Sequence, residues 1–353
     1  MNYSGKRVVV TGGLGFIGSN LALRLVDLGA QVTIIDSAVD GCGANYANIR
    51  EIGQQVTLIQ SDIGEAEAIG PAIAKADVIF NLAGEISHTH SMEFPERDLN
   101  LNTVAQLRFV LACAEKAPGV RIVYAGTRQI YGRPVYLPVD EDHPVAPVDF
   151  NGVHKYAATQ YHMLLARLGR LNAVVLRLSN VYGPRMALNV ACQGFLSTFF
   201  RHALSAQQLE VFGDGRQLRD PVYVEDVVEA FLLAGGDSAR CGQAYNVGGP
   251  EALDLLSLAR ILSELTEGPE PRLRPFPPER LQIDIASYVS DWSRLKNDTG
   301  WTPRVTFREG AARTLAFYRD RLSDYLDARK EGALCQMREH RGPRMRLTYS
   351  QGG

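Results

Sequence analysis

The feature that most constrains the fold of this chain is a glycine-rich turn near its start. The sequence TGGLGFIG follows an apolar strand over Lys6–Val10 and precedes a helical pattern over Ser19–Leu28. Gly12, Gly15 and Gly18 stand where such a turn leaves a sheet, passes close to a pyrophosphate and packs its helix against the sheet. The helix N-terminus adds N–H groups and the positive end of its dipole, which favour phosphate. The pattern predicts a dinucleotide-binding turn, and a glycine-rich turn without a ligand is the alternative.

The second expected strand indicates which dinucleotide is bound. It covers Val32–Ile35 and ends in Asp36. A carboxylate at this point accepts a hydrogen bond from a ribose 2′-OH and repels a 2′-phosphate. We therefore expect NAD rather than NADP.

Strand and helix patterns alternate through the first half of the chain. The expected strands are Arg7–Val10, Val32–Ile35, Val56–Gln60, Val78–Leu82, Arg121–Ala125 and Ala173–Leu178. The expected helices between them are Ser19–Leu28, Glu65–Lys75, Asp98–Lys116 and Gly152–Leu168. Repeated βα units of this kind predict an α/β fold with a doubly wound parallel sheet, a Rossmann domain, over residues 1–183.

The rhythm changes after Gly183, where shorter elements are separated by Gly/Pro turns. We expect a smaller C-terminal lobe over residues 184–326, with some segments returning to the first domain. Residues 327–353 are polar and Arg-rich, which predicts a flexible tail, with a partner-binding arm as the alternative.

Composition excludes several classes of protein. The 353 residues carry a net charge of −2, which gives no electrostatic basis for binding nucleic acid or an anionic membrane surface. No apolar run approaches the roughly 20 residues that span a bilayer. Five scattered cysteines without a CxxC pair fit a reducing compartment and predict neither disulfides nor a zinc site. We expect a cytoplasmic protein without a metal.

Further motifs follow the later strands. They are Ser61-Asp62-Ile63, Asn81-Leu82-Ala83-Gly84, Ala125-Gly126-Thr127, the helical Lys155, and RLSNVYGPR over 177–185. In this order the motifs resemble the extended short-chain dehydrogenase/reductase family, specifically its nucleotide-sugar epimerases and dehydratases. The resemblance covers roughly residues 5 to 320.

The resemblance implies roles for individual residues. The expected NAD contacts are Gly12, Gly15, Phe16, Ile17, Gly18, Asp36, Asp62, Ile63 and Ala83. Lys155 matches the lysine that binds the nicotinamide ribose and lowers the pKa of a catalytic tyrosine. Thr127 matches the Ser/Thr that hydrogen-bonds the sugar hydroxyl undergoing oxidation. The alternatives are a strand-end cap for Thr127 and a solvated helix position for Lys155.

One departure from the family pattern affects the chemistry directly. The family carries Tyr-x-x-x-Lys, but the residue four before Lys155 is Asn151. An amide cannot act as the phenolate base. Tyr156 points about 100° round the helix from Lys155 and is no simple substitute. The neighbouring groups that could supply a base are His154, Tyr161 and Tyr131, although we expect His154 to be a surface residue.

A second departure narrows the reaction. The 4,6-dehydratases carry an Asp-Glu pair after the Ser/Thr, and the sugar-acid decarboxylases carry a Glu there. This chain has Arg128 and Gln129, and neither side chain shuttles protons near neutral pH. Arg128 is expected to be either an anion clamp or a solvated residue.

The C-terminal lobe is expected to hold a nucleotide-diphosphate sugar. Asn180 matches a diphosphate-contacting asparagine, Arg219 matches a phosphate clamp, and Arg280 is a second candidate clamp. Arginine suits this role because its planar fork binds phosphate oxygens bidentately. Alternatively, Arg219 pairs with Asp220 or Glu225.

These observations together predict an NAD-dependent nucleotide-sugar epimerase that oxidises a sugar hydroxyl transiently, with Thr127, Lys155 and Asn151 in its catalytic site. A nucleotide-sugar dehydrogenase or dehydratase is the enzymatic alternative. The absence of the tyrosine leaves a non-catalytic NAD- or nucleotide-sugar-binding protein as a third possibility. The family's dimer packs two helices per subunit, here Asp98–Lys116 and Gly152–Leu168, and predicts a homodimer.

Overall fold

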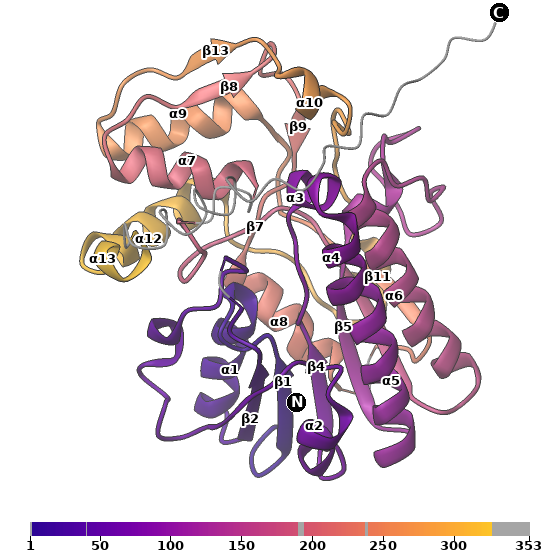
Figure 1. Ribbon diagram of the computed structural model, residues 1–353. Helices are drawn as coiled ribbons and strands as arrows, with labels where there is room; N and C mark the ends of the chain where they lie inside the picture. The colour runs from indigo at the N-terminus through magenta and orange to yellow at the C-terminus, as the bar shows by residue number, and fades with distance from the viewer. Residues whose placement is uncertain (1, 40, 190–193, 237–238, 327–353) are drawn as a thin grey trace, which may run out of the picture.

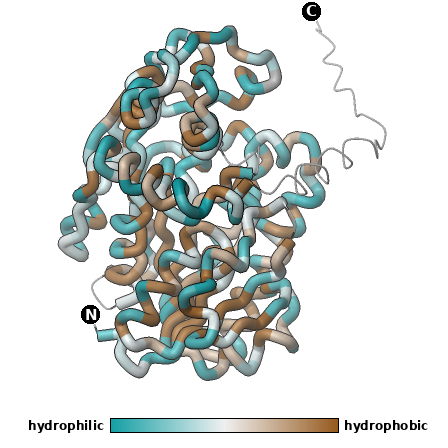
Figure 2. The backbone as a smooth tube through the Cα atoms, turned by 90° about the vertical axis from the view of Figure 1, so that its left-hand side faces the viewer, coloured by the Kyte–Doolittle hydropathy of each residue, from teal (hydrophilic) through white to brown (hydrophobic). Residues whose placement is uncertain are grey.

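The computed structural model describes residues 2–39, 41–189, 194–236 and 239–326 of the chain. Figure 1 shows a larger lobe around a parallel sheet and a smaller lobe above it. Hydrophobic residues concentrate inside the larger lobe, as the brown segments of Figure 2 show. The expected tail, residues 327–353, lies outside the described residues.

Seven strands of the described chain form the parallel sheet, in the order β11-β6-β5-β4-β1-β2-β3. They are β1 (Arg7–Thr11), β2 (Gln31–Asp36), β3 (Thr57–Gln60), β4 (Val78–Asn81), β5 (Arg121–Thr127), β6 (Asn172–Leu178) and β11 (Gln243–Val247). The strand order reverses between β1 and β4, and such a sheet binds its ligand at the carboxyl ends of the strands there. The register sets Thr11 of β1 level with Ile35 of β2 and Asn81 of β4, so these three strands end at one rim.

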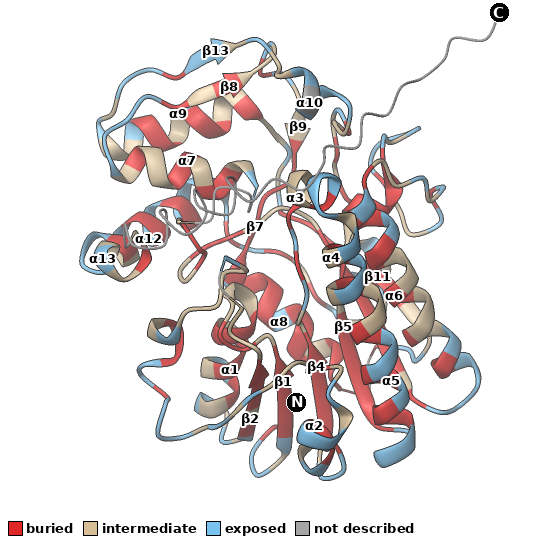
Figure 3. Cartoon of the chain, in the orientation of Figure 1, coloured by how far each residue is buried: buried red, intermediate tan, exposed pale blue. Residues whose placement is uncertain are grey.

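Helices cover both faces of the sheet. On one face α1 (Phe16–Asp27) packs beside α8 (Val224–Ala234). The other face carries α2 (Ala66–Ile73), α5 (Ala105–Lys116) and α6 (Phe150–Arg167). A separate apolar cluster fills the space on each side, and the central strands between them are buried along their length (Figure 3). Burial on both faces explains why these strands are continuous apolar runs.

The smaller lobe has an apolar core of its own, built from aromatic and aliphatic side chains that include Phe200, Leu258 and Phe307. Its elements are α7 (Phe195–Leu204), β8 (Glu210–Phe212), β9 (Leu218–Arg219), β12 (Leu253–Asp254), α9 (Leu255–Thr266), β13 (Arg272–Arg274), α10 (Pro278–Leu281), α12 (Phe307–Arg319) and α13 (Leu322–Tyr325). Short connecting elements are η1 (Tyr46–Ile49), α3 (His88–Glu93), η3 (Arg128–Tyr131), β7 (Val181–Tyr182), β10 (Val222–Tyr223) and α11 (Ser293–Thr299).

Two helices differ from the sequence-based expectation. Helix α1 begins at Phe16, directly after the Gly15 N-cap, and not at Ser19, so the glycine turn itself opens the helix. The helix expected over Asp98–Lys116 begins earlier, at Pro95, as α4 (Pro95–Leu99), and it reaches α5 through a π-helical turn, η2 (Asn100–Val104). None of the described helices combines the length and the hydropathy needed to cross a bilayer.

Candidate active site

The glycine turn between β1 and α1 lies against the end of β4. Gly12 has a φ of +67°, and a Cβ on it would lie 2.9 Å from the backbone of Leu82 and Ala83. A Cβ on Gly18 would lie 2.2 Å from the Gly12 carbonyl oxygen, so both positions require glycine. Gly15 is the N-cap residue of α1, and it has no side chain that could accept from the N–H groups of the first turn. The turn therefore presents bare backbone and an uncapped helix N-terminus, which suits a pyrophosphate.

Asp36 ends β2 at the same rim and is almost fully buried. Its Oδ2 accepts from the Leu14 amide and its Oδ1 from the Ala38 amide, each at 2.9 Å. Burial raises the pKa of Asp36 from its ordinary value, and the two amides oppose that shift. Both oxygens keep a second acceptor position for a ribose hydroxyl, while a 2′-phosphate would meet the carboxylate's charge.

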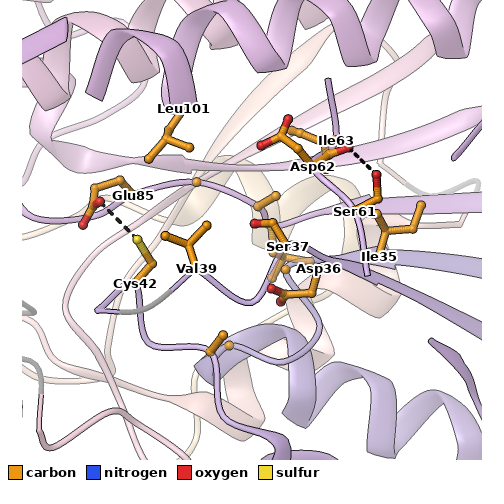
Figure 4. Close-up of a pocket in the computed structure, with 16 residues that line it drawn as sticks. Ile35, Asp36, Ser37, Val39, Cys42, Ser61, Asp62, Ile63, Glu85 and Leu101 are labelled. Atoms are coloured by element: carbon orange, nitrogen blue, oxygen red, sulfur yellow. Dashed lines mark hydrogen bonds between the residues drawn. The ribbon is translucent and has the colours of Figure 1, made fainter. Parts of the chain in front are cut away.

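A pocket lies at the rim between Asp36 and the segment that follows β4 (Figure 4). Asp62 and Ile63 line it near Asp36, at the end expected for the adenine. Ala83, Gly84 and Glu85, which follow β4, also line it. Figure 4 shows Glu85, Cys42, Val39 and Leu101 on one side of the pocket, and Ser61, Asp62 and Ile63 on the other. The lining combines the glycine turn with the carboxylates of Asp36 and Asp62, which suits the phosphate, ribose and adenine of a dinucleotide.

Two expected cofactor residues have other side-chain environments. Phe16 packs against the apolar core of the smaller lobe, and Ile17 packs against the cluster beneath α1 and α8. Neither residue is among those that line the pocket.

The sequence analysis missed the group around Glu85. The Glu85 amide and carbonyl bond reciprocally to the Asn102 side chain, each at 3.1 Å. The Cys42 thiol donates to Glu85 Oε2 at 3.3 Å, and Arg97 lies 3.6 Å from the same oxygen. No local pattern joins these residues, because they come from three separate segments of the chain, with Arg97 and Asn102 together on the α4–η2 helix.

Lys155 is buried on α6 beside the backbone of Gly84. Its Nζ lies 3.2 Å from the point that a Cβ on Gly84 would occupy, and 5.8 Å from the Tyr124 ring centroid. Burial lowers the pKa of Lys155 to about 8, although Asp98 and Glu85 oppose the shift. The structure therefore does not place Lys155 at a solvated helix position, and its amine borders the Gly84 end of the pocket.

Asn151 is directed into a buried polar network and not into the pocket. Its Nδ2 donates to Asp98 Oδ2 at 2.9 Å and to the Glu85 carbonyl at 3.0 Å. The other carboxylate oxygen of Asp98 lies 2.7 Å from His154 Nδ1. Both amide hydrogens of Asn151 are thus used within the protein, which leaves no donor for a sugar. The expectation of a surface position for His154 is wrong, because Asp98 holds it in the interior.

The other candidate bases are also placed. Tyr131 is fully buried, and its hydroxyl donates to Asn246 and accepts from Arg177. Tyr161 packs within the apolar cluster between the sheet and its covering helices. Neither side chain lies at the pocket.

Thr127 ends β5 and caps the η3 turn. Its Oγ1 accepts from the Gln129 amide at 3.2 Å. The capping alternative is therefore seen in the structure, but this bond uses an oxygen lone pair. The hydroxyl hydrogen takes no part in the cap and suits a contact with a sugar hydroxyl.

Two arginines meet where the smaller lobe joins the larger one. Arg219 is 6% exposed, and its Nη1 donates to the carbonyls of Leu218 and Ala286. Arg128 donates from Nη2 to Asn180 Oδ1 at 3.2 Å and stacks 5.0 Å from the Tyr288 ring centroid. Burial and the nearby charge of Arg128 lower the pKa of Arg219 to about 9. Burial likewise lowers the pKa of Arg128.

The two guanidinium groups have unused hydrogen-bonding capacity. Arg219 Nε and Arg128 Nη1 are buried, and neither atom has a partner among the described residues. The carboxylates proposed as partners of Arg219 are engaged elsewhere, since Asp220 binds Ser179 and Ser290, and Glu225 binds Arg313. A buried cation pair of this kind favours an anionic ligand.

Arg280 makes a different contact from Arg128 and Arg219. It is exposed on α10, and its guanidinium stacks 5.3 Å from the Phe212 ring centroid. In the part of the chain that the structure describes, no group of three or more His, Cys, Asp or Glu side chains is placed to hold a metal ion.

Comparisons with known proteins agree with this geometry. The model of the NAD-dependent epimerase/dehydratase family matches residues 8–248. A UDP-glucose 4-epimerase of Mycolicibacterium smegmatis is 34% identical over 319 residues, which cover 89% of this chain and 99% of that protein.

Solved structures give the same picture. A UDP-glucose 4-epimerase from Thermotoga maritima, solved with UDP-glucose, has a TM-score of 0.81 and 28% identity, and covers 89% of this chain and 99% of its own. The NAD complex of the Thermus thermophilus UDP-glucose 4-epimerase has a TM-score of 0.79 and 28% identity, with the same two coverages. The chain therefore belongs to the NAD-dependent epimerase/dehydratase family, of the extended short-chain dehydrogenase/reductase type, and its cofactor is NAD.

Proposed function

We propose that this protein is an epimerase of nucleotide-diphosphate sugars, with UDP-glucose and UDP-galactose as the first pair to test. The observation that carries the proposal is the buried cation pair, Arg128 and Arg219, in a chain whose other lobe holds an NAD pocket. A diphosphate bound by this pair would direct its sugar toward Thr127 and Lys155. The names of the M. smegmatis and T. maritima relatives support a UDP-sugar substrate.

The residues around the pocket have distinct roles in this proposal. Gly12, Gly15 and Asp36 hold the dinucleotide, and NAD, when bound, supplies a reversible hydride acceptor for a carbon of the sugar ring. The Thr127 hydroxyl donates to the sugar hydroxyl that is oxidised. The Lys155 ammonium stabilises negative charge that develops on that oxygen. Epimerisation follows when the ketone presents its other face and the hydride returns.

The smaller lobe positions the substrate. Arg219 and Arg128 bind diphosphate oxygens with the donors that have no protein partner, and Asn180 completes the contact. Arg280, at the surface of α10, adds a second clamp at the outer edge. Charge-assisted contacts in a buried site are strong because water does not compete for the donors.

Epimerisation fits this site better than loss of water. A dehydratase needs an acid and a base beside the reacting carbons, but the residues after Thr127 are Arg128 and Gln129. Gln129 donates from Nε2 to Asp149 Oδ2 at 2.8 Å, and its amide does not exchange protons at neutral pH. A simple oxidation and reduction at one carbon requires neither group.

We also propose a homodimer that packs through α5 and α6. The outer sides of these helices expose Leu107, Leu111, Val153 and Leu164 by 38–46%. An apolar stripe on two neighbouring helices is typical of a subunit contact. Light scattering during gel filtration measures the mass directly.

Two measurements test the proposed activity. Mass spectrometry of small molecules released on denaturing the purified protein is expected to show NAD, with or without a UDP-sugar. NMR of UDP-galactose incubated with the protein is expected to show UDP-glucose, without added cofactor. Should neither UDP-glucose, UDP-galactose nor their N-acetylated forms be converted, while UDP binds, the epimerase assignment is wrong.

A further inference from the structure

A histidine–aspartate pair lies beside the N-terminus of α6, outside the residues assigned so far. His88 is the first residue of α3, and its Nδ1 lies 3.0 Å from Asp149 Oδ2. The Asp149 side chain is fully buried, while the His88 side chain is 35% exposed. The Nδ1 atom is buried against Asp149, so the exposed part of the ring lies on the side away from that carboxylate.

Asp149 is held as an anion in a fixed position. Its Oδ1 accepts from the Gly152 amide at 2.7 Å and so caps α6, and its Oδ2 accepts from Gln129 Nε2 at 2.8 Å. Burial alone would raise the pKa of Asp149, but the contacts with His88, Gly152 and Gln129 hold it below its ordinary value. An anionic Asp149 fixes the proton of a neutral His88 on Nδ1 and leaves a lone pair on Nε2.

The pair is linked to the site through Gln129. The same residue that binds Asp149 with its side chain donates from its backbone amide to Thr127 Oγ1. Helix α3 also follows the Ala83–Gly84 end of the pocket and packs on the first turn of α6, where Ser91 Oγ accepts from the Asn151 amide at 3.2 Å. His88 therefore lies on the helix that follows the Gly84 segment of the pocket, and it is connected to Thr127 through Asp149 and Gln129.

We propose that His88 accepts the proton of the sugar hydroxyl during oxidation, with Asp149 as its positioning residue, in place of the phenol that Asn151 cannot supply. This proposal rests on the proposed epimerase function. In the step the O–H bond breaks and its proton moves to His88 Nε2. The electron pair left on oxygen completes the C=O bond, and the ring carbon's hydride passes to the NAD already assigned. The reverse transfer from His88 returns the proton when the ketone is reduced.

Asp98 and Arg97 are ionisable groups near α3 that have partners of their own. The elements that pack against α3 are α4 and α6, and their charged or titratable groups near it are Glu96, Arg97, Asp98, Asp149, His154 and Lys155. Asp98 binds Asn151 and His154, and Arg97 pairs with Glu85. Asp149 is the carboxylate at ion-pair distance from His88. His88 Nδ1 lies 3.0 Å from Asp149 Oδ2 without meeting hydrogen-bond geometry, and catalytic hydrogen bonds are often poorly aligned before substrate binds.

The kinetic test compares His88→Gln with His90→Gln in the NAD-loaded protein. His90 lies on the same short helix, where its ring packs on Phe94, and it serves as the matched control. With UDP-galactose as substrate, His88→Gln is expected to lower kcat by about 10²–10⁴-fold with KM within a few-fold, because a general base acts in the transition state. His90→Gln is expected to match the wild type.

Asp149→Asn tests the positioning role. The amide oxygen still caps α6, so the fold is kept. The kcat is expected to fall at least tenfold while KM stays within a few-fold, because the imidazolium that forms in the transition state loses the anion that stabilises it. A kcat equal to that of the wild type would remove Asp149 from the mechanism.

Chemical footprinting supplies a readout that does not depend on activity. Diethyl pyrocarbonate modification of His88, located by mass spectrometry, is expected to be blocked by UDP-galactose but not by UDP, with His90 unaffected by either. Equal modification of His88 with both ligands overturns the proposal, as does a His88→Gln kcat within about threefold of an active wild type; in both cases the epimerase function stands. A wild type that converts no UDP-sugar overturns both.

Discussion

Replacing Asn151 with alanine tests the structural role that the buried network gives this residue. The substitution removes one hydrogen bond to the Asp98 carboxylate, worth about 1.5–3 kcal/mol, and one to the Glu85 carbonyl, worth about 1 kcal/mol. Asn102 still donates to that carbonyl, and alanine gains about 0.5 kcal/mol in helix propensity. We therefore expect the free energy of unfolding to fall by about 2–3.5 kcal/mol.

Urea unfolding at saturating NAD measures this change. Gln160→Ala on the same helix is the control and is expected to stay within about 0.5 kcal/mol of the wild type. Asn151→Asp sharpens the test by placing a second carboxylate against Asp98, which raises the pKa of the pair in the folded state. Its stability deficit is thus expected to exceed that of Asn151→Ala at pH 7.5 and to narrow as the pH falls toward 5. An unfolding midpoint for Asn151→Ala equal to that of the wild type would refute the reasoning.

Three further predictions concern the ligands. Asp36→Ala is expected to weaken NAD binding in calorimetry, and a wild-type preference for NADPH would contradict the role given to this carboxylate. Arg219→Ala is expected to weaken UDP binding at least tenfold, because a buried charge-assisted contact is worth about 1.5–3 kcal/mol, while NAD affinity stays the same; an equal loss for both ligands would point to misfolding. Because the pKa of Lys155 is lowered to about 8, sugar oxidation is expected to slow as the pH rises through 8. The effect of Lys155 on stability runs in the opposite direction. Because the unfolded chain binds this proton more tightly than the folded protein, the free energy of unfolding is expected to rise between pH 8 and the ordinary lysine pKa of about 10.4. A Lys155→Arg variant that lacks this pH dependence in both measurements would support the assignment.

The fold was predictable to the extent that its signals are local. The hydrophobic pattern of each βα unit is visible within about thirty residues of sequence. The glycine turn and Asp36 likewise predict the cofactor position without reference to distant segments. Strand β11 was not predicted, because its place in the sheet depends on pairing with β6. The early start of α1 at Phe16 was missed because glycine is only modestly enriched at helix N-caps, where Ser, Thr, Asn and Asp are the stronger signals.

The site was less predictable because its polar groups meet across the fold. The sequence shows that Asn151 cannot be a base, but the direction of its side chain depends on Asp98, 53 positions earlier. The Asp98 carboxylate also contacts His154 Nδ1, and this contact keeps the His154 side chain buried. His88 and Asp149 could not be predicted as a pair, because neither residue belongs to a sequence motif. A pairing between segments so far apart leaves no periodic signal.

The path of the chain between the lobes also limits how the enzyme can open. After β6 the backbone enters the smaller lobe at α7, returns for α8 and β11, leaves again for α9, and returns once more for α11. Helices α12 and α13 of the smaller lobe are the last elements of the described residues. A single connecting strand would allow the lobes to swing apart as rigid bodies about a hinge. Here several segments of the chain connect the two lobes, and together they resist such a rotation. We therefore expect a substrate to enter through small sliding movements of the lobes and rearrangement of surface segments. For the same reason a protease cut between the lobes would not release either one as a folded unit.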